Sequence, residues 1–109
     1  MTDKTKKYLY DILESVNSIE DFIAEINFLQ YQQNKMVRRA VEREFEIIGE
    51  AMNELLKIDK NLKITSAKRI IGMRNRVIHG YDKIDNGVIW GTIKKHLPLL
   101  KTQVKELLK

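Results

Sequence analysis

Apolar residues recur at every third or fourth position over four stretches of the chain, which is the period of a helix with one buried face. The first stretch covers about 22 residues and has its apolar positions at Leu9, Ile12, Leu13, Val16, Ile19, Ile23 and Ile26. The second has them at Val37, Val41, Phe45, Ile48, Met52 and Leu55. The third runs through Ile70, Ile71, Arg74 and Val77, of which Arg74 is charged. The fourth has its apolar positions at Val88, Ile89, Ile93, Leu97, Leu100, Val104 and Leu107. The pattern predicts four helices around a shared core.

Polar residues separate the first two of these helices. Asn27 and Asn34 bracket FLQYQQ, a segment that could be a short helix or a continuation of its neighbour. Asn34 is a suitable N-cap for the second helix, because its side chain can accept a free backbone N–H of the first turn. Residues 59–61, Asp-Lys-Asn, end that second helix.

Similar signals delimit the third and fourth helices. Thr65 or Ser66 can cap the third helix at its start, and Gly80 is a suitable C′ residue at its end. The segment YDKIDNG then predicts a turn, in which Asp85 or Asn86 can cap the fourth helix.

The architecture that buries four such faces is a compact antiparallel bundle. We therefore predict an all-α fold of four to five helices, in which Pro98 kinks or splits the last one. On the second helix, the small residues Ala40, Gly49 and Ala51 allow another helix to approach closely. Its charged residues alternate in sign at helical spacings and predict i,i+4 ion pairs, from Arg39 and Arg43 to Glu46 and Glu50.

Length and composition narrow the class of protein. The 109 residues fit one domain, residues 1–109. Cysteine is absent, which excludes disulfides, thiolate metal sites and Cys nucleophiles, and points to a reducing compartment. No run of 18 residues is both apolar and uncharged, so we expect no membrane span. These features predict a helical protein of the cytoplasm.

The net charge of +5 is unevenly distributed. Residues 1–60 carry 9 Lys/Arg and 12 Asp/Glu, whereas residues 61–109 carry 11 Lys/Arg and 3 Asp/Glu, a net of +8. Such a basic block in a folded domain is typical of a surface that binds phosphate backbones. Solubility alone also explains many basic helix faces, so charge does not decide the function.

Chemically capable side chains converge in the segment RNRVIHGY, residues 74–81. His79 carries the side chain whose ordinary pKa lies nearest neutrality, so it can act as a general base or acid. Arg74 can contact two phosphoryl oxygens at once. If the helix ends at Gly80, both side chains could face one groove, which would suit phosphodiester chemistry without a metal. From the residues alone, Tyr81 is better explained as a core or turn tyrosine whose hydroxyl caps a backbone group.

The octet resembles the RxxxxHxY signature of the HEPN-domain toxins of the HepT-like type. The resemblance extends over nearly the whole chain, with residues 27–36 the weakest part. Its other matching segments are 10–14 (YDILE), 43–51 (REFEIIGEA), 71–75 (IGMRN), 88–90 (VIW) and 97–101 (LPLLK).

This resemblance implies a metal-independent endoribonuclease that needs no cofactor and works as a homodimer with a composite active site. Arg74 would then bind the scissile phosphate, and His79 would act on the ribose 2′-OH or the leaving 5′-oxygen. Asn75 would support them, and Arg69 and Arg76 could line the RNA path. The expected product is a 2′,3′-cyclic phosphate.

The resemblance also implies a toxin–antitoxin pair of the type VII kind. In such pairs a nucleotidyltransferase antitoxin adenylylates the tyrosine that corresponds to Tyr81. AMP at this position would add negative charge and bulk where the substrate phosphate belongs.

A different class of function is also compatible with the sequence: a non-catalytic helical module that docks a nucleotidyltransferase, a nucleotide or both. The intact pair of Arg74 and His79 distinguishes the two, because a docking module needs neither. A DNA-binding role is weaker, since no helix-turn-helix spacing is present. Outside the octet, we interpret His96 as a solvated helix residue, Trp90 as a core or interface anchor, and Glu46 and Glu50 as members of ion pairs rather than metal ligands.

Overall fold

The computed structural model describes the backbone of residues 1–78 and 85–109 and the side chains of residues 1–75 and 85–109. This part of the chain forms six helices and no strand, which confirms the predicted all-α class. The helices are α1 (Asp3–Ile23), α2 (Phe28–Gln33), α3 (Lys35–Ile58), α4 (Ala67–Ile78), α5 (Asn86–Lys95) and α6 (Leu97–Leu107). Counted as one helix broken at Pro98, α5 and α6 bring the total to the predicted five.

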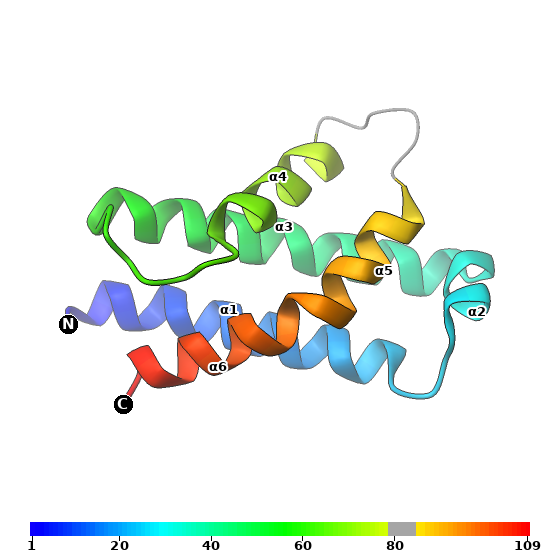
Figure 1. Cartoon of the computed structure of the whole chain (residues 1–109), viewed down its shortest axis with the longest axis horizontal. Helices are drawn as coiled ribbons and strands as arrows, with labels where there is room; N and C mark the ends of the chain where they lie inside the picture. Colours follow the sequence, from blue (N-terminus) through cyan, green and yellow to red (C-terminus); the bar gives the residue numbers. More distant parts are fainter. Residues whose placement is uncertain (79–84) are drawn as a thin grey trace.

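The long helices α1 and α3 lie side by side and run in opposite directions (Figure 1). α4 packs against α3, while α6 packs against α1 and completes an antiparallel bundle. The predicted apolar faces form its core, where the largest fully buried side chains on α1 and α3 are Leu9, Ile12, Ile19, Phe45, Ile48, Met52 and Leu55. Since α1 ends at Ile23, Ile26 packs against this core from the following connection rather than from the helix.

Residues 28–33 form a short separate helix, because Asn27 caps its start and Asn34 separates it from α3. The Asn27 side chain accepts the N–H of Gln30, and the Gln30 side chain accepts the N–H of Asn27, both at 2.9 Å. This reciprocal pair is a capping box. Asn34 accepts the N–H of Val37 at 3.1 Å, which confirms it as the N-cap of α3.

The start of α4 is fixed from two sides. Ser66 directly precedes the helix, and its carbonyl accepts the N–H of Ile70 at 3.0 Å. Thr65 is tied instead to α6, because its N–H donates to the Gln103 side chain at 3.2 Å. The predicted C′ residue, Gly80, lies outside the described residues.

At α5 and α6 the structure shows which of the predicted caps is used and whether Pro98 kinks or splits the last helix. Asp85 is the N-cap of α5 and accepts the N–H groups of Gly87 and Val88 at 2.8 and 3.2 Å. Pro98 splits the last helix rather than kinking it, since α5 ends at Lys95 and α6 begins at Leu97 with the proline in its first turn. A proline is tolerated there because the first turn has no intrahelical partners for its N–H groups.

Aromatic packing connects α2 to α5. The Trp90 ring lies 5.9 Å from the Phe28 ring and 5.3 Å from the Tyr31 ring, between centroids. Trp90 is therefore partly buried against the core, which agrees with its interpretation as a core anchor. None of the helices described is long and apolar enough to cross a bilayer.

Candidate functional site

Two of the predicted site residues, Arg74 and Asn75, lie in the second half of α4. His79 and Tyr81 lie outside the described residues, as does the side chain of Arg76. Arg69 is exposed on the first half of α4. The structure therefore tests the surroundings of Arg74 and Asn75 and leaves the rest of the octet as a prediction.

Arg74 faces α3, where it packs directly on Gly49. A methyl group added at Gly49 would overlap the Cβ and Cγ atoms of Arg74. Glycine at this position lets α4 approach α3 closely, which confirms for Gly49 the interpretation of the small residues on α3. The stem of Arg74 is held by this contact, so its side chain is only 24% exposed.

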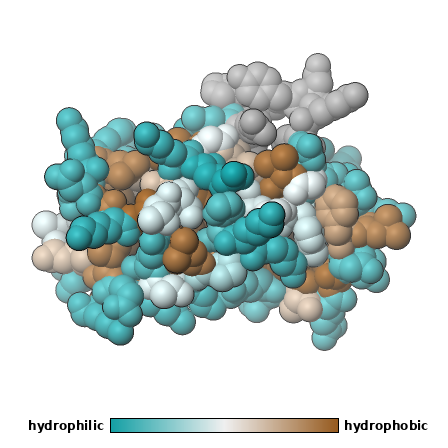
Figure 2. All heavy atoms as spheres, viewed as in Figure 1, coloured by the Kyte–Doolittle hydropathy of each residue, from teal (hydrophilic) through white to brown (hydrophobic). Residues whose placement is uncertain are grey.

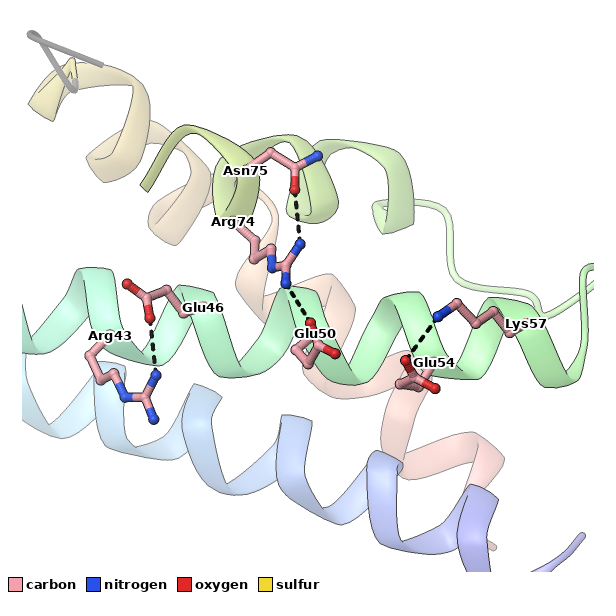
Figure 3. Close-up of polar contacts among 7 residues, drawn as sticks. All are labelled: Arg43, Glu46, Glu50, Glu54, Lys57, Arg74 and Asn75. Carbon is pink, nitrogen blue, oxygen red and sulfur yellow. Dashed lines mark hydrogen bonds and ion pairs between the residues drawn. The ribbon is translucent and has the colours of Figure 1, made fainter. Parts of the chain in front are cut away.

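The Arg74 guanidinium makes two charge-assisted contacts. Its Nη2 donates to Glu50 Oε2 on α3 at 2.5 Å, and its Nη1 donates to Asn75 Oδ1 at 3.1 Å (Figure 3). Its Nε is buried and has no hydrogen-bond partner among the described residues. Because a guanidinium carries five N–H donors, Arg74 is oriented by two of them and retains others.

Figure 3 draws three glutamates of α3, Glu46, Glu50 and Glu54, which lie four residues apart along the helix. Glu46 pairs with Arg43 at 3.0 Å and Glu54 pairs with Lys57 at 3.1 Å, both within the helix. Of the three, only Glu50 pairs with a cation of another helix among the described residues. The interpretation of Glu46 and Glu50 as members of ion pairs is confirmed.

The i,i+4 register predicted for the charges of α3 is wrong. Arg39 pairs with Glu42 at 2.8 Å and Arg43 with Glu46 at 3.0 Å, each at an i,i+3 spacing. Positions three and four apart both lie on the same helix face, so periodicity alone does not choose between them. Glu50, which lies seven residues after Arg43, is left to contact Arg74.

Sequence reasoning placed Glu50 in an ion pair but did not identify Arg74 as its partner. The residues are 24 positions apart, and their contact depends on how α4 crosses α3. The available signal was the glycine directly before Glu50, since a small residue marks a point where a second helix can come close enough to pair.

A basic hollow of about 330 Å³ lies between α4 and the start of α5. It is lined by Lys68, Arg69, Gly72, Met73 and Val88. Of its cations, only Arg69 was predicted to contact RNA. Among the described residues, no group of three or more His, Cys, Asp or Glu side chains is close enough to hold a metal ion.

Comparison with known proteins identifies the family of this chain. The model of the family described as "Ribonuclease HepT-like" matches residues 12–107, from the middle of α1 to the last residue of α6. The chain belongs to this family. A Methanocaldococcus jannaschii protein named "Putative RNase MJ1380" is 39% identical over 102 residues, which are 92% of this chain and 93% of that protein. "Probable ribonuclease HepT" of Thermococcus cleftensis is 38% identical over 105 residues, 95% of this chain and 96% of that protein. No solved structure matches significantly.

Membership of the HepT-like family places the chain among ribonucleases at the family level. The matched range includes α4 and the whole RNRVIHGY segment. The resemblance to HepT-like proteins is thereby confirmed, whereas the roles of individual residues stay predictions.

Proposed function

We propose that this HepT-like chain is a metal-independent endoribonuclease whose reaction depends on Arg74 and His79. The observation that carries the proposal is the orientation of Arg74. Its guanidinium is held by Glu50 and Asn75 on an acid-free helix, five residues before His79 in the sequence. An oriented guanidinium can stabilise the charge that develops on a phosphoryl group in the transition state.

In the proposed reaction, the ribose 2′-oxygen attacks the adjacent phosphorus and the bond to the leaving 5′-oxygen breaks. His79 either accepts the proton of the 2′-OH or donates one to the 5′-oxygen. Arg74 binds the non-bridging phosphate oxygens, and Asn75 helps to orient its guanidinium. The products are a 2′,3′-cyclic phosphate and a free 5′-OH. Since DNA lacks the 2′-OH, this chemistry selects RNA.

The regulatory part of the proposal rests on the HepT-like resemblance. Two copies of the chain would form a homodimer in which the two RNRVIHGY segments share one cleft. A partner nucleotidyltransferase antitoxin would silence this toxin by adenylylating Tyr81. The added phosphate would compete with the RNA phosphate for the same cations.

The test is cleavage of pooled RNA by the purified protein in excess EDTA, with Arg74→Ala and His79→Ala variants alongside. We expect fragments with 2′,3′-cyclic ends from the parent and a loss of cleavage in both variants. Circular dichroism and light scattering should show unchanged helix content and oligomeric state. His96→Ala is the matched control, because His96 is the other histidine of the chain and lies at the junction of α5 and α6.

Cleavage at the parental rate by the Arg74 or His79 variant would refute the role of that residue. No cleavage by the parent across several classes of RNA would instead favour the docking module. In that case binding of a nucleotidyltransferase or of a nucleotide would be measured next.

A further inference from the structure

The basic hollow between α4 and the start of α5 contains a glycine that nothing in the described chain requires. Gly72 is exposed and lies in the interior of the helix, where glycine is less favourable than alanine. A methyl group added there would meet no atom of a described residue within 4 Å. Gly49 differs, because Arg74 covers it. With respect to the described residues, the absence of a side chain at Gly72 therefore leaves open space over this part of α4.

The chemistry around Gly72 favours an anion with an apolar portion. Lys68 and Arg69 are exposed and form no ion pair or side-chain hydrogen bond with another described residue. Met73 and Val88 supply apolar surface to the same hollow. Its volume of about 330 Å³ lies at the lower end of the roughly 300–1,000 Å³ typical of small-ligand sites. A phosphate with its attached ribose matches this combination.

We propose that the hollow is a binding subsite for the sugar-phosphate backbone of single-stranded RNA, with Lys68 and Arg69 contacting phosphate while the strand passes over Gly72. The proposal rests on the proposed ribonuclease function for the identity of the ligand. The subsite is separate from the scissile phosphate. At about 100° per residue, Gly72 and Arg74 point to opposite sides of α4, and Arg74 faces α3.

A second copy of the chain is the other occupant that could cover Gly72, but charge disfavours it. In a two-fold interface a surface patch meets the same patch of the other copy, so an interface centred on this hollow would bring Lys68 and Arg69 near their copies. Like charges placed opposite each other weaken association. On the face shown in Figure 2, apolar side chains lie in separate groups among hydrophilic ones, and no single broad apolar patch covers it.

Binding is tested with a non-cleavable probe, so that it is measured independently of catalysis. The probe is a fluorescein-labelled, fully 2′-O-methylated single strand of about 20 nucleotides and mixed sequence. Its affinity is measured by fluorescence anisotropy at several salt concentrations for the parent and for Gly72→Ala, Gly72→Leu, Arg69→Ala and Gly91→Ala. Gly91 is the matched control, because it lies within α5 and also has no atom within 4 Å of an added methyl group.

We expect Gly72→Ala to raise the melting temperature by a few degrees, because alanine favours the helix. The same substitution should weaken binding of the probe roughly fivefold or more, because the added methyl group excludes the strand. Gly72→Leu should weaken binding further. Arg69→Ala should weaken it roughly three- to tenfold and reduce the slope of log affinity against log salt by about 0.7. Gly91→Ala should leave affinity unchanged.

Three results would overturn the subsite. The first is unchanged probe affinity in the Gly72 variants. The second is a parent that does not bind the probe even at low salt. The third is a change of oligomeric state in Gly72→Leu without RNA, seen by light scattering, which would assign the hollow to contact between copies.

Failure of the subsite and failure of the ribonuclease function give different results. A parent that cleaves RNA while Gly72→Ala keeps the parental kcat and KM would refute the subsite alone. A parent that binds the probe through Gly72 and Arg69 but cleaves no RNA would refute the ribonuclease function alone.

Discussion

Glu50 accepts a hydrogen bond from Arg74 at 2.5 Å, and Gly49, the residue before it, lies beneath the Arg74 stem. The glutamate is half exposed, so the pair is screened by water and contributes at most about 1 kcal/mol to stability. Its larger effect is on geometry, because it fixes one edge of the guanidinium and leaves other donors available. If Arg74 binds the scissile phosphate, Glu50 is a positioning residue for it.

We therefore expect Glu50→Gln to separate kcat from KM. Glutamine keeps an acceptor oxygen but loses the charge, so the guanidinium is held less firmly, which should lower kcat about tenfold or more. The same change removes a negative charge beside the phosphate site, so KM should stay the same or fall. The unfolding free energy should change by less than about 1 kcal/mol. Steady-state cleavage kinetics and urea unfolding measure the two effects.

Glu46→Gln is the matched control for this experiment. It lies one helical turn before Glu50 on α3 and pairs with Arg43 on the same helix, so it removes an equivalent charge without touching Arg74. We expect kcat close to that of the parent. Equal kcat in the parent and in Glu50→Gln would remove Glu50 from the site, while equal losses in both variants would indicate a general charge effect.

At the scale of the helices, the contact between α3 and α4 passes through Gly49. Replacement by alanine would improve the intrinsic helix propensity of α3 by about 1 kcal/mol, but its methyl group would overlap the Arg74 stem. Overpacking of this kind typically costs about 1–3 kcal/mol. We expect Gly49→Ala to be destabilising on balance and to impair cleavage by displacing α4.

Thermal and urea unfolding check this prediction, with Gly91→Ala as the reference for propensity alone. Gly91→Ala should be neutral or stabilising, because the space around it is open. A Gly49→Ala variant as stable as Gly91→Ala would show that α4 can move aside without loss. The close approach of the two helices would then have no energetic importance.

The helix boundaries that could be predicted are those fixed by local chemistry. Asn34 and Asp85 cap their helices through backbone N–H groups two or three residues away, and Pro98 interrupts the last helix through its own ring. Contacts that depend on how two helices cross could not be predicted from the sequence pattern. The pairing of Glu50 with Arg74 and the hollow at Gly72 both depend on the angle and distance between packed elements, which periodicity does not specify.

At the scale of the whole molecule, the sequence pattern predicted the core because the buried faces repeat over many residues. It did not predict the environment of Tyr31, which packs its ring on Trp90 of α5 at 5.3 Å between centroids. Its hydroxyl is buried without a hydrogen-bond partner among the described residues. Burial raises the pKa of Tyr31 above its ordinary value of 10.0, and the nearby charge of Glu42 raises it further.

This raised pKa makes the stability of the whole fold sensitive to alkaline pH. Below about pH 10 the tyrosine is neutral in the folded and unfolded chains, so its contribution to stability is fully present. Above this pH the unfolded chain ionises Tyr31 while the folded chain holds it neutral. The unfolding free energy should therefore fall, by up to about 1.4 kcal/mol per pH unit, until the folded pKa is reached.

Tyr31→Phe keeps the ring against Trp90 and removes the ionising hydroxyl. Near neutral pH we expect stability to be equal to that of the parent or higher by up to about 1 kcal/mol, because a buried hydroxyl without a partner is lost. Above pH 10 the variant should lose stability less steeply than the parent, as measured by urea unfolding across the pH range. Tyr10→Phe, at a residue that is 57% exposed, should follow the parent. If the curves of the parent and Tyr31→Phe stay parallel above pH 10, Tyr31 ionises as easily in the folded protein as in the unfolded chain, and the packing of α2 against α5 does not exclude water from its hydroxyl.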